Sequence, residues 1–287
     1  MVSILTLNYN DYDTTYEFIN THINYVFIEK IVVVDNSSTD DSFKKLKAIN
    51  NEKLVLLKTN KNIGYGAGNN YGLRWIKDNL KSEYVLLSNP DVIISECSII
   101  KVYDFLKAHK NAVIAAPFML NAKGEKMHNT AFKLPTLKSY FCTIGLIGSK
   151  YFNTLPYSDI VDEDAQFKKV GAVSGSCFML DLDKFLSFGG FDENVFLYCE
   201  EVIVGLRAKM NLMDIYLLSN ETFIHNHSVS ISKTYNSQIK RQKILYQSKL
   251  YVIKHYYKAS KLIYALAQLI VKIALFEYFI KEKVLKK

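Results

Sequence analysis

Residues 84–92 read YVLLSNPDV, an apolar run that ends abruptly in polar residues and a proline. The uncharged residues 84–87 predict a buried strand with helices over both faces. Pro90 cannot donate a ladder hydrogen bond, so we expect the strand to stop there. Asp91 is then delivered to the carboxyl end of a strand, where open α/β sheets bind their ligands. A carboxylate at that point can bind a divalent cation that carries a diphosphate, although an Asn-Pro-Asp turn that caps the next helix is the plainer alternative.

Around this run, residues 1–118 alternate between short apolar runs and amphipathic stretches. The predicted strands are residues 3–7, 30–35, 54–57, 84–88 and 112–116. The predicted helices lie between them, at residues 16–24, from about 40, at 69–80 and at 97–109. Strands separated by helices of this length predict an α/β fold with a largely parallel central sheet and helices on both faces.

Residues 119–170 are less regular, and glycines and prolines mark several turns in them. A long insertion in a compact domain is more often functional than idle, so we expect an acceptor-side loop or lid here. Strand signals return at residues 170–173 and 177–181, and residues 201–210 follow a helical pattern.

The composition is that of an ordinary globular protein, with 49% hydrophobic and 22% charged residues among 287. Its four cysteines lack paired metal-binding spacing, which suits reduced thiols in a cytoplasmic protein. The chain enters a strand-like run at once without a basic leader, so we expect no secretory signal.

The positive charge is concentrated at the carboxyl end of the chain. Residues 233–287 hold 13 Lys and Arg against two Glu, a net charge of +11, whereas the whole chain carries +8. We therefore divide the chain into a catalytic domain, residues 1–232, and a basic tail, residues 233–287. A mildly acidic body with a basic tail argues against a nucleic-acid binder and for a localised anionic partner.

The tail has a helical pattern from residue 239 to residue 280. Its polar positions follow one narrow stripe, formed by Lys254, Lys258, Lys261, Gln268 and Lys272. The remaining face is apolar, as at Leu262, Leu266, Leu269, Ile270 and Ile273. We expect amphipathic helices that lie on an anionic membrane surface; a helix packed on its own domain is the alternative.

Four further sites in the sequence could carry chemistry. Residues 35–40 (DNSSTD) follow a predicted strand, and Asp35 could accept a hydrogen bond from a nucleobase imide or simply belong to a helix cap. Residues 60–72 (NKNIGYGAGNNYG) hold four glycines, which let backbone approach a ligand and donate from a helix N-terminus. The pair Glu200 and Glu201 could supply a general base, or merely favour a helix N-terminus electrostatically. His225 could bind the same cation as Asp91, although a buried structural imidazole is commoner.

In this order, the stretches resemble the inverting glycosyltransferases of family 2, which have the GT-A fold, and especially their rhamnosyltransferase-like branch. The resemblance runs from about residue 3 to residue 230. It rests on VDNSSTD (34–40), NKNIGYGAGNNYG (60–72), SNPD (88–91), GSCFML (175–180), GGFDENVFLYCEE (189–201) and HNHSVS (225–230).

The resemblance implies a role for each matching residue. It makes Asp91 and His225 ligands of Mg²⁺ or Mn²⁺, and Glu201 or Glu200 the base. The donor-binding residues it implies are Asn8, Asp35, Ser37, Asn62, Gly64, Asn69 and Asn89. The acceptor-binding residues it implies are Asp192 and Arg207.

The chain departs from the family pattern at three positions. Glu201 stands at the base position one methylene longer than the usual Asp, which leaves the base open between Glu201 and Glu200. Ile203 replaces a second acidic residue, and Ser228 replaces a glycine that usually follows the His.

The resemblance implies an inverting transfer of a sugar from dTDP-rhamnose or a UDP-hexose to a saccharide or lipid-diphosphate-linked acceptor. We expect this enzyme on the cytoplasmic face of the cell membrane, in capsule or O-antigen synthesis. A sugar nucleotidyltransferase and a non-catalytic membrane-bound scaffold are the alternatives.

Overall fold

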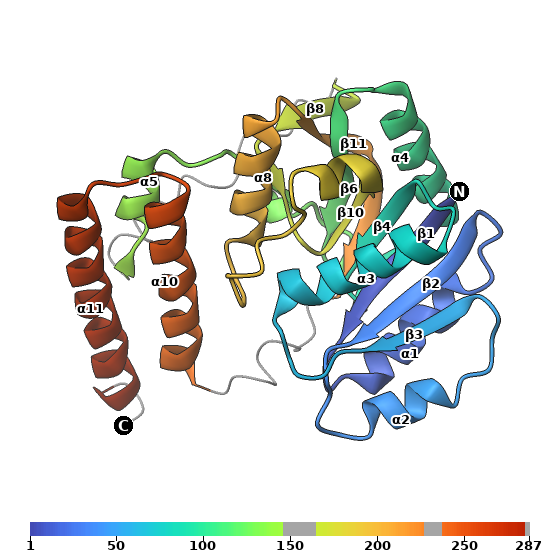
Figure 1. Ribbon diagram of the computed structural model, residues 1–287, viewed down its shortest axis with the longest axis horizontal. Helices are drawn as coiled ribbons and strands as arrows, with labels where there is room; N and C mark the ends of the chain where they lie inside the picture. Colours follow the sequence, from blue (N-terminus) through green and yellow to red (C-terminus); the bar gives the residue numbers. More distant parts are fainter. Residues whose placement is uncertain (146–164, 227–236, 285–287) are drawn as a thin grey trace.

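The computed structural model describes residues 1–145, 165–226 and 237–284 (Figure 1). The larger strands are β1 (Val2–Asn8), β2 (Ile28–Asp35), β3 (Leu54–Lys58), β4 (Tyr84–Ser88), β6 (Ala112–Leu120), β10 (Cys177–Asp181) and β11 (Asp214–His225). The shorter strands are β5 (Val92–Ile94), β7 (Ala131–Phe132), β8 (Phe167–Val170) and β9 (Ala172–Val173). The helices are α1 (Tyr12–His22), α2 (Ser42–Lys47), α3 (Tyr65–Asn79), α4 (Glu96–Ala108), η1 (His128–Thr130), α5 (Leu137–Cys142), α7 (Leu182–Ser187), α8 (Glu200–Met210), α10 (Gln238–His255) and α11 (Lys261–Val284).

The central sheet has the strand order β3-β2-β1-β4-β10-β6-β11-β5, with β8 beside β11. The four strands from β3 to β4 are parallel, as the alternation of strands and helices predicts. Beyond them the sheet is mixed, because β10 runs antiparallel between β4 and β6. This arrangement lets the chain turn back beside β4 from the end at which Asp91 lies.

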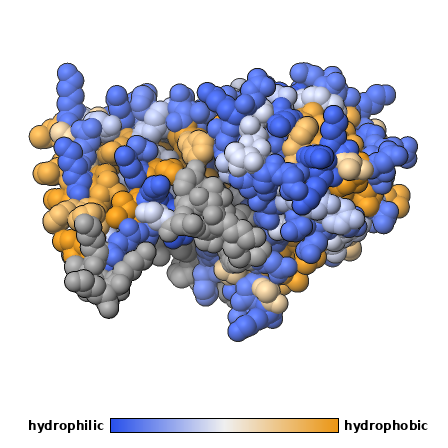
Figure 2. Space-filling view, turned by 90° about the horizontal axis from the view of Figure 1, so that it is seen from below, coloured by the Kyte–Doolittle hydropathy of each residue, from blue (hydrophilic) through white to orange (hydrophobic). Residues whose placement is uncertain are grey.

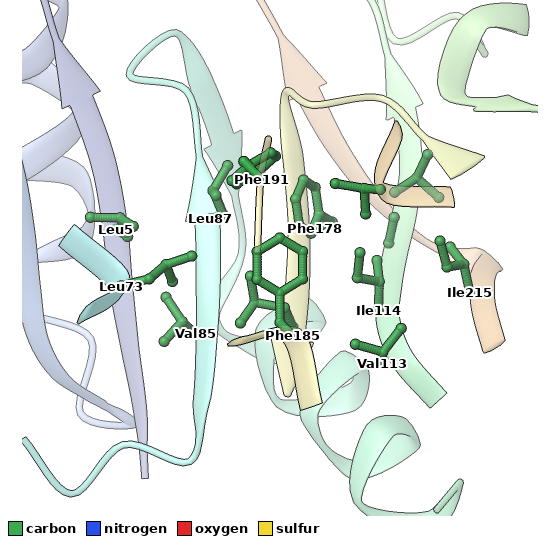
Figure 3. Close-up of a cluster of buried hydrophobic side chains, with 14 of the residues drawn as sticks. Leu5, Leu73, Val85, Leu87, Val113, Ile114, Phe178, Phe185, Phe191 and Ile215 are labelled. Carbon is green, nitrogen blue, oxygen red and sulfur yellow. The ribbon is translucent and has the colours of Figure 1, made fainter. Parts of the chain in front are cut away.

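Helices cover both faces of the sheet, because successive strand residues point to opposite sides. On one face α3, α7 and α8 pack on side chains such as Leu5 and Val32. Figure 3 shows this cluster, with Leu73 and Phe185 from the helices against Val85 and the other strand residues. The opposite face packs against α1, α2 and α4. The predicted α/β class with helices on both faces is confirmed.

The glycine-rich run lies mostly inside α3, which begins at Tyr65, four residues earlier than predicted. Gly64 precedes it with φ +88°, a conformation that favours glycine. A Cβ at Gly72 would lie 2.4 Å from Leu5 Cδ1, so this glycine lets α3 pack closely on β1. The run therefore serves helix packing, a role that the sequence argument did not consider.

The tail forms two antiparallel helices, α10 and α11, instead of one continuous helix. The N–H of Gln238, at the start of α10, donates to the Glu282 carboxylate near the end of α11 over 2.8 Å. Lys258 lies in the connection with φ +49°, so the predicted lysine stripe does not continue along one helix. The chain reverses here because Val252 and Ile253 of α10 and Ala267, Val271, Ala274 and Tyr278 of α11 are buried in a common hydrophobic cluster.

Some predictions lie outside the described residues. Residues 146–164 include much of the expected lid, and residues 227–236 include Ser228 and the boundary drawn at residue 232. That boundary stays a prediction.

Candidate active site

The carboxyl ends of β1, β2 and β4 meet at one edge of the sheet. The register pairs Asn8 with Asp35, the last residues of β1 and β2. The Ser88-Asn89-Pro90-Asp91 sequence follows β4, which pairs with β1 on the other side. Parallel strands thus bring the first two predicted carboxylates, Asp35 and Asp91, to the same edge.

Asp35 is fully buried and organises the loop that follows β2. Its carboxylate accepts from Asn8 Nδ2 (2.8 Å), from Ser38 Oγ (2.6 Å) and from the Ser38 N–H (2.9 Å). Ser37, between these residues, has φ +63° and is partly exposed. A nucleobase could reach the Asp35 carboxylate only if Ser38 moved, so its predicted contact with the base stays a prediction.

Asn36, which the sequence argument did not assign, ties this loop to the start of α3. Its Nδ2 donates to Asn62 Oδ1 (3.0 Å) and to the Gly64 carbonyl (3.1 Å). The side chain of Asn69 is buried and donates to the Tyr65 carbonyl of its own helix. The side chains of Asn8, Asn62 and Asn69 therefore form hydrogen bonds within the protein and help to shape this edge of the sheet. Their contacts with a nucleotide-sugar stay a prediction.

Asp91 and His225 lie together although 134 residues separate them in the chain. His225 Nε2 lies 3.1 Å from Asp91 Oδ1, and both side chains are one-tenth exposed. The pairing follows from the sheet, because His225 ends β11 opposite Val92 of β5. The Asn226 N–H also donates to the Asp91 carbonyl over 3.0 Å.

Glu201, at the start of α8, lies against the loop that precedes β10. Its Oε1 accepts from the Gly175 N–H over 3.3 Å, and the Gly175 carbonyl accepts from the Tyr65 hydroxyl over 2.6 Å. The next residue, Ser176, accepts through its carbonyl from the Asn89 N–H over 2.8 Å. A short path of contacts thus joins Glu201 to the segment that carries Asp91. Gly175 lies in the GSCFML motif, but only its position in the fold reveals its contact with Glu201.

Glu200 is buried beside Glu201 at the start of α8. It is 6% exposed, and its Oε1 has no hydrogen-bond partner within the described part of the chain. A cavity of about 10 Å³, enough for one water at most, lies beside both glutamates and is otherwise lined mainly by apolar side chains such as Ile114 and Phe178. Burial raises the pKa of both carboxyls, and the nearby Glu201 charge raises that of Glu200 further.

Asp192 and Arg207, the predicted acceptor-binding residues, contact each other and the tail. Arg207 Nη2 lies 3.3 Å from Asp192 Oδ2, and that same oxygen accepts from the hydroxyls of Tyr251 in α10 (3.0 Å) and of Tyr256 just after it (2.6 Å). Although burial acts in the opposite direction, the hydrogen bonds from Tyr256 and Asn194 lower the pKa of Asp192. Both charges are thus satisfied within the protein, and a contact with an acceptor stays a prediction.

The Asp91–His225 pair fits a divalent cation that is shared with a diphosphate. Among the described residues, no three His, Cys, Asp or Glu side chains gather as a cation site. Mg²⁺ and similar ions are commonly held by one or two carboxylates, with substrate phosphates and waters completing the coordination. Asp91 would supply the carboxylate of that pattern, and His225, whose Nε2 lies 3.1 Å from it, would be a second ligand.

The sequence model of glycosyl transferase family 2 matches residues 3–183. A curated relative, the low-salt glycan biosynthesis hexosyltransferase Agl10 of Haloferax volcanii, is 28% identical over 228 residues, which are 79% of this chain and 68% of that protein. The N-acetylglucosaminyl-diphospho-decaprenol L-rhamnosyltransferase of Mycobacterium tuberculosis is 27% identical over 210 residues, which are 68% of this chain and 66% of that protein.

Among solved structures, that of GalNAc-T7 with UDP, GalNAc and Mn²⁺ superposes with a TM-score of 0.61. The alignment covers 80% of this chain and 44% of that one at 10% identity, so the likeness concerns the fold alone. It identifies the mixed sheet with helices on both faces as the GT-A type of fold.

Proposed function

The chain belongs to glycosyl transferase family 2, and we propose that it moves a rhamnosyl or hexosyl group from a nucleoside diphosphate sugar to a saccharide hydroxyl with inversion at the anomeric carbon. The observation that carries this proposal is the shared sheet edge. Asp91 lies beside His225 there, and Glu201 connects to the same segment through Gly175, Ser176 and Asn89.

The proposed reaction is a single displacement. The Glu201 carboxylate accepts the proton of the acceptor hydroxyl while that oxygen attacks the anomeric carbon from the face opposite the diphosphate. The new glycosidic bond forms as the bond between the sugar and the diphosphate breaks. Mg²⁺ or Mn²⁺, held by Asp91 and His225, would neutralise the charge that develops on the leaving diphosphate.

Glu201 is the better candidate for the base, and Glu200 is better suited to tuning it. Glu201 is partly exposed and accepts from a backbone N–H of the loop at the site, whereas Glu200 is buried and its Oε1 has no hydrogen-bond partner among the described residues. A carboxyl whose pKa is raised by burial accepts a proton more readily than an exposed one. A neutral Glu200 next to it adds no second buried charge.

The donor assignment follows the relatives that the chain resembles. We propose dTDP-rhamnose as the first candidate and a UDP-hexose as the second, because one relative is named as an L-rhamnosyltransferase and another as a hexosyltransferase. The nucleobase and ribose of the donor would bind near the loop that Asp35 holds, where Ser37 is partly exposed. Asn89 would lie near the diphosphate of the donor.

A lipid-diphosphate-linked saccharide is the proposed acceptor, since the same relative is named for a diphospho-decaprenol substrate. Helix α11 supports this choice, because apolar residues are exposed on it at a spacing of four and three, namely at Leu262, Leu266, Leu269, Ile273, Phe276 and Ile280. Figure 2 shows hydrophobic residues gathered at the end of the molecule that the tail occupies.

Helix α11 is the one described helix that is long and apolar enough to cross a membrane. Its other face packs on α10, which carries five Lys and Arg residues, so a spanning α11 would bring those charges into the hydrocarbon. We therefore propose that α11 lies on an anionic membrane surface, on the cytoplasmic side, where capsule or O-antigen intermediates are built.

Changing Leu269 and Ile273 to Asp should abolish flotation with phosphatidylglycerol vesicles, while Val26→Asp on the catalytic body should not. Equal flotation of all three proteins would contradict the proposal.

The non-catalytic alternative depended on Ile203, which stands where the family carries an acid. Ile203 is 1% exposed and lies in the hydrophobic cluster that α10 and α11 share. Its side chain therefore serves the contact between α8 and the tail, and its apolar character does not remove the carboxylates at the sheet edge.

The test is a screen of the full-length protein against a panel of nucleotide-sugars with and without Mn²⁺. We expect dTDP-rhamnose or a UDP-hexose with Mn²⁺ to raise the unfolding temperature and to release nucleoside diphosphate once a synthetic lipid-linked N-acetylglucosaminyl diphosphate is added. Protection without any turnover, across acceptors of both lipid-linked and free saccharide type, would favour the scaffold instead.

A further inference from the structure

The backbone just before the two glutamates is strained. Tyr198 and Cys199 are consecutive residues other than glycine, with φ +70° and +69°. This left-handed conformation is unfavourable for such residues and persists only where the surrounding structure imposes it. Because Cys199 is the residue from which α8 starts, its conformation sets the direction in which Glu201 leaves the backbone.

Contacts from three helices impose that conformation. From α3, the Tyr65 N–H donates to the Phe196 carbonyl over 3.0 Å. From α5, the Tyr140 hydroxyl lies 2.8 Å from Cys199 Sγ. From the tail helix α10, the buried Ser248 hydroxyl donates to the Leu197 carbonyl over 2.7 Å.

Helix α10 also holds the other end of this segment. The hydroxyls of Tyr251 and Tyr256 converge on Asp192, seven residues before Cys199. Arg207 of α8 donates to the Tyr256 hydroxyl over 2.8 Å and to the Gly190 carbonyl over 2.8 Å. Residues 192–199 are therefore held near both ends by side chains of α10 and of Tyr256, which directly follows it.

The position of α10 is itself fixed on the catalytic body. Lys249 is 7% exposed, and its Nζ donates to the carbonyl and the hydroxyl of Thr143, each over 2.9 Å. Val252 and Ile253 are fully buried beside Val202 and Ile203 of α8. A helix placed in this way can transmit a fixed geometry to the segment that it touches.

We propose that α10 and Tyr256, the residue that follows it, position the transfer site: Ser248, Tyr251 and Tyr256 hold residues 192–199 so that Glu201 faces the loop at Gly175. This inference rests on the proposed role of Glu201 as base. The tail thereby has a second task beside any membrane contact of α11, and the three side chains act through Glu201 without touching the reacting atoms.

The experiment compares full-length Ser248→Ala and the double variant Tyr251→Phe with Tyr256→Phe against Tyr264→Phe, which removes a hydroxyl from α11 outside this segment. Turnover of dTDP-rhamnose, or of the UDP-hexose that protects the protein, is followed by release of nucleoside diphosphate. We expect kcat to fall at least tenfold in the first two variants, with the donor KM within twofold of the wild type. Tyr264→Phe should keep both constants. Hydrogen exchange of the amides of residues 198–203 should rise in step with the loss of kcat.

Unchanged kcat and unchanged exchange in Ser248→Ala and in the double variant would overturn the proposal, as would a loss that appears only in the donor KM. Glu201→Gln separates this failure from a failure of the proposed function. If Glu201→Gln is inactive while the α10 variants are fully active, the positioning role alone is wrong. If Glu201→Gln stays active, the assignment of Glu201 as the base is wrong, and the proposed positioning role of α10 is wrong as well.

Discussion

The loop after β2 and the segment before α8 both belong to the proposed site, yet they are held in different ways. At the loop, the Asp35 carboxylate accepts three hydrogen bonds from Asn8 and Ser38, and Ser37 between Asp35 and Ser38 is a single left-handed residue. The segment before α8 ends in two left-handed residues, followed by two carboxyls whose pKa values are raised. The loop is stabilised by its own contacts, whereas the segment depends on contacts from distant parts of the chain. The Asp35 carboxylate is surrounded by hydrogen-bond donors, whereas Glu200 and Glu201 lie beside mainly apolar side chains.

The largest effect is expected from a change of Glu201, the carboxylate that follows the strained segment before α8. Glu201→Gln should lower kcat about 10³-fold, because the amide cannot accept the acceptor proton. The matched variant Glu200→Gln should keep kcat within about threefold, because Gln resembles the protonated acid that burial favours at this position. Initial rates at saturating donor measure both. Equal losses in the two variants would contradict the division of roles between the two glutamates.

An intermediate effect is expected from a change of Asp35, which holds the loop after β2. Asp35→Asn removes the charge that accepts from Asn8 and Ser38, so the loop should lose its fixed conformation. Hydrogen bonds to a charged group contribute about 1.5–3 kcal/mol each, so the donor KM should rise at least tenfold with little change in kcat. Steady-state kinetics with varied donor concentration measure this split. A loss confined to kcat would place Asp35 with the chemical step instead.

The smallest expected effect concerns stability. Burial raises the pKa of Glu200 from 4.5 to about 8, so the folded protein binds this proton more tightly than the unfolded chain does. Stability of the wild type should therefore fall as pH rises from about 4.5 through about 8. Glu200→Gln removes this dependence, so its unfolding temperature should exceed that of the wild type by several degrees at pH 9 and match it at pH 4. Thermal unfolding at the two pH values checks the sign, and a variant that is less stable at pH 9 would contradict it.

The sequence predicted the elements whose signal is local. The apolar runs gave β2 and β4, and the rule that ligands bind at strand carboxyl ends placed Asp91 correctly at the edge. The order of the motifs predicted the family, which the family match over residues 3–183 confirms. A shared cation of His225 and Asp91 was one of two alternatives considered for this histidine, and the resemblance favoured it over a buried structural imidazole, although 134 residues separate the two.

What the sequence did not predict depends on contacts between distant residues. Tyr65 and Gly175 reach Glu201 because α3, β10 and α8 meet, and no local pattern records that meeting. The reversal after His255 was missed because the periodicity of α10 and α11 reads as one helix until their buried faces are seen to pack together. The glycines of α3 were assigned to ligand approach, whereas the partner of Gly72 is Leu5 of another element.

The central claim is that Asp35, Asp91 and Glu201 serve a single site. The most direct measurement is a crystal structure of the protein with Mn²⁺ and the nucleoside diphosphate of the donor that protects it. The account predicts that Mn²⁺ is bound by Asp91 and His225 and that the nucleobase lies beside the loop that Asp35 holds. It also predicts that the Glu201 carboxylate faces the end of the diphosphate to which the sugar was attached. A nucleotide bound elsewhere, with Glu201 on another face of the molecule, would contradict it.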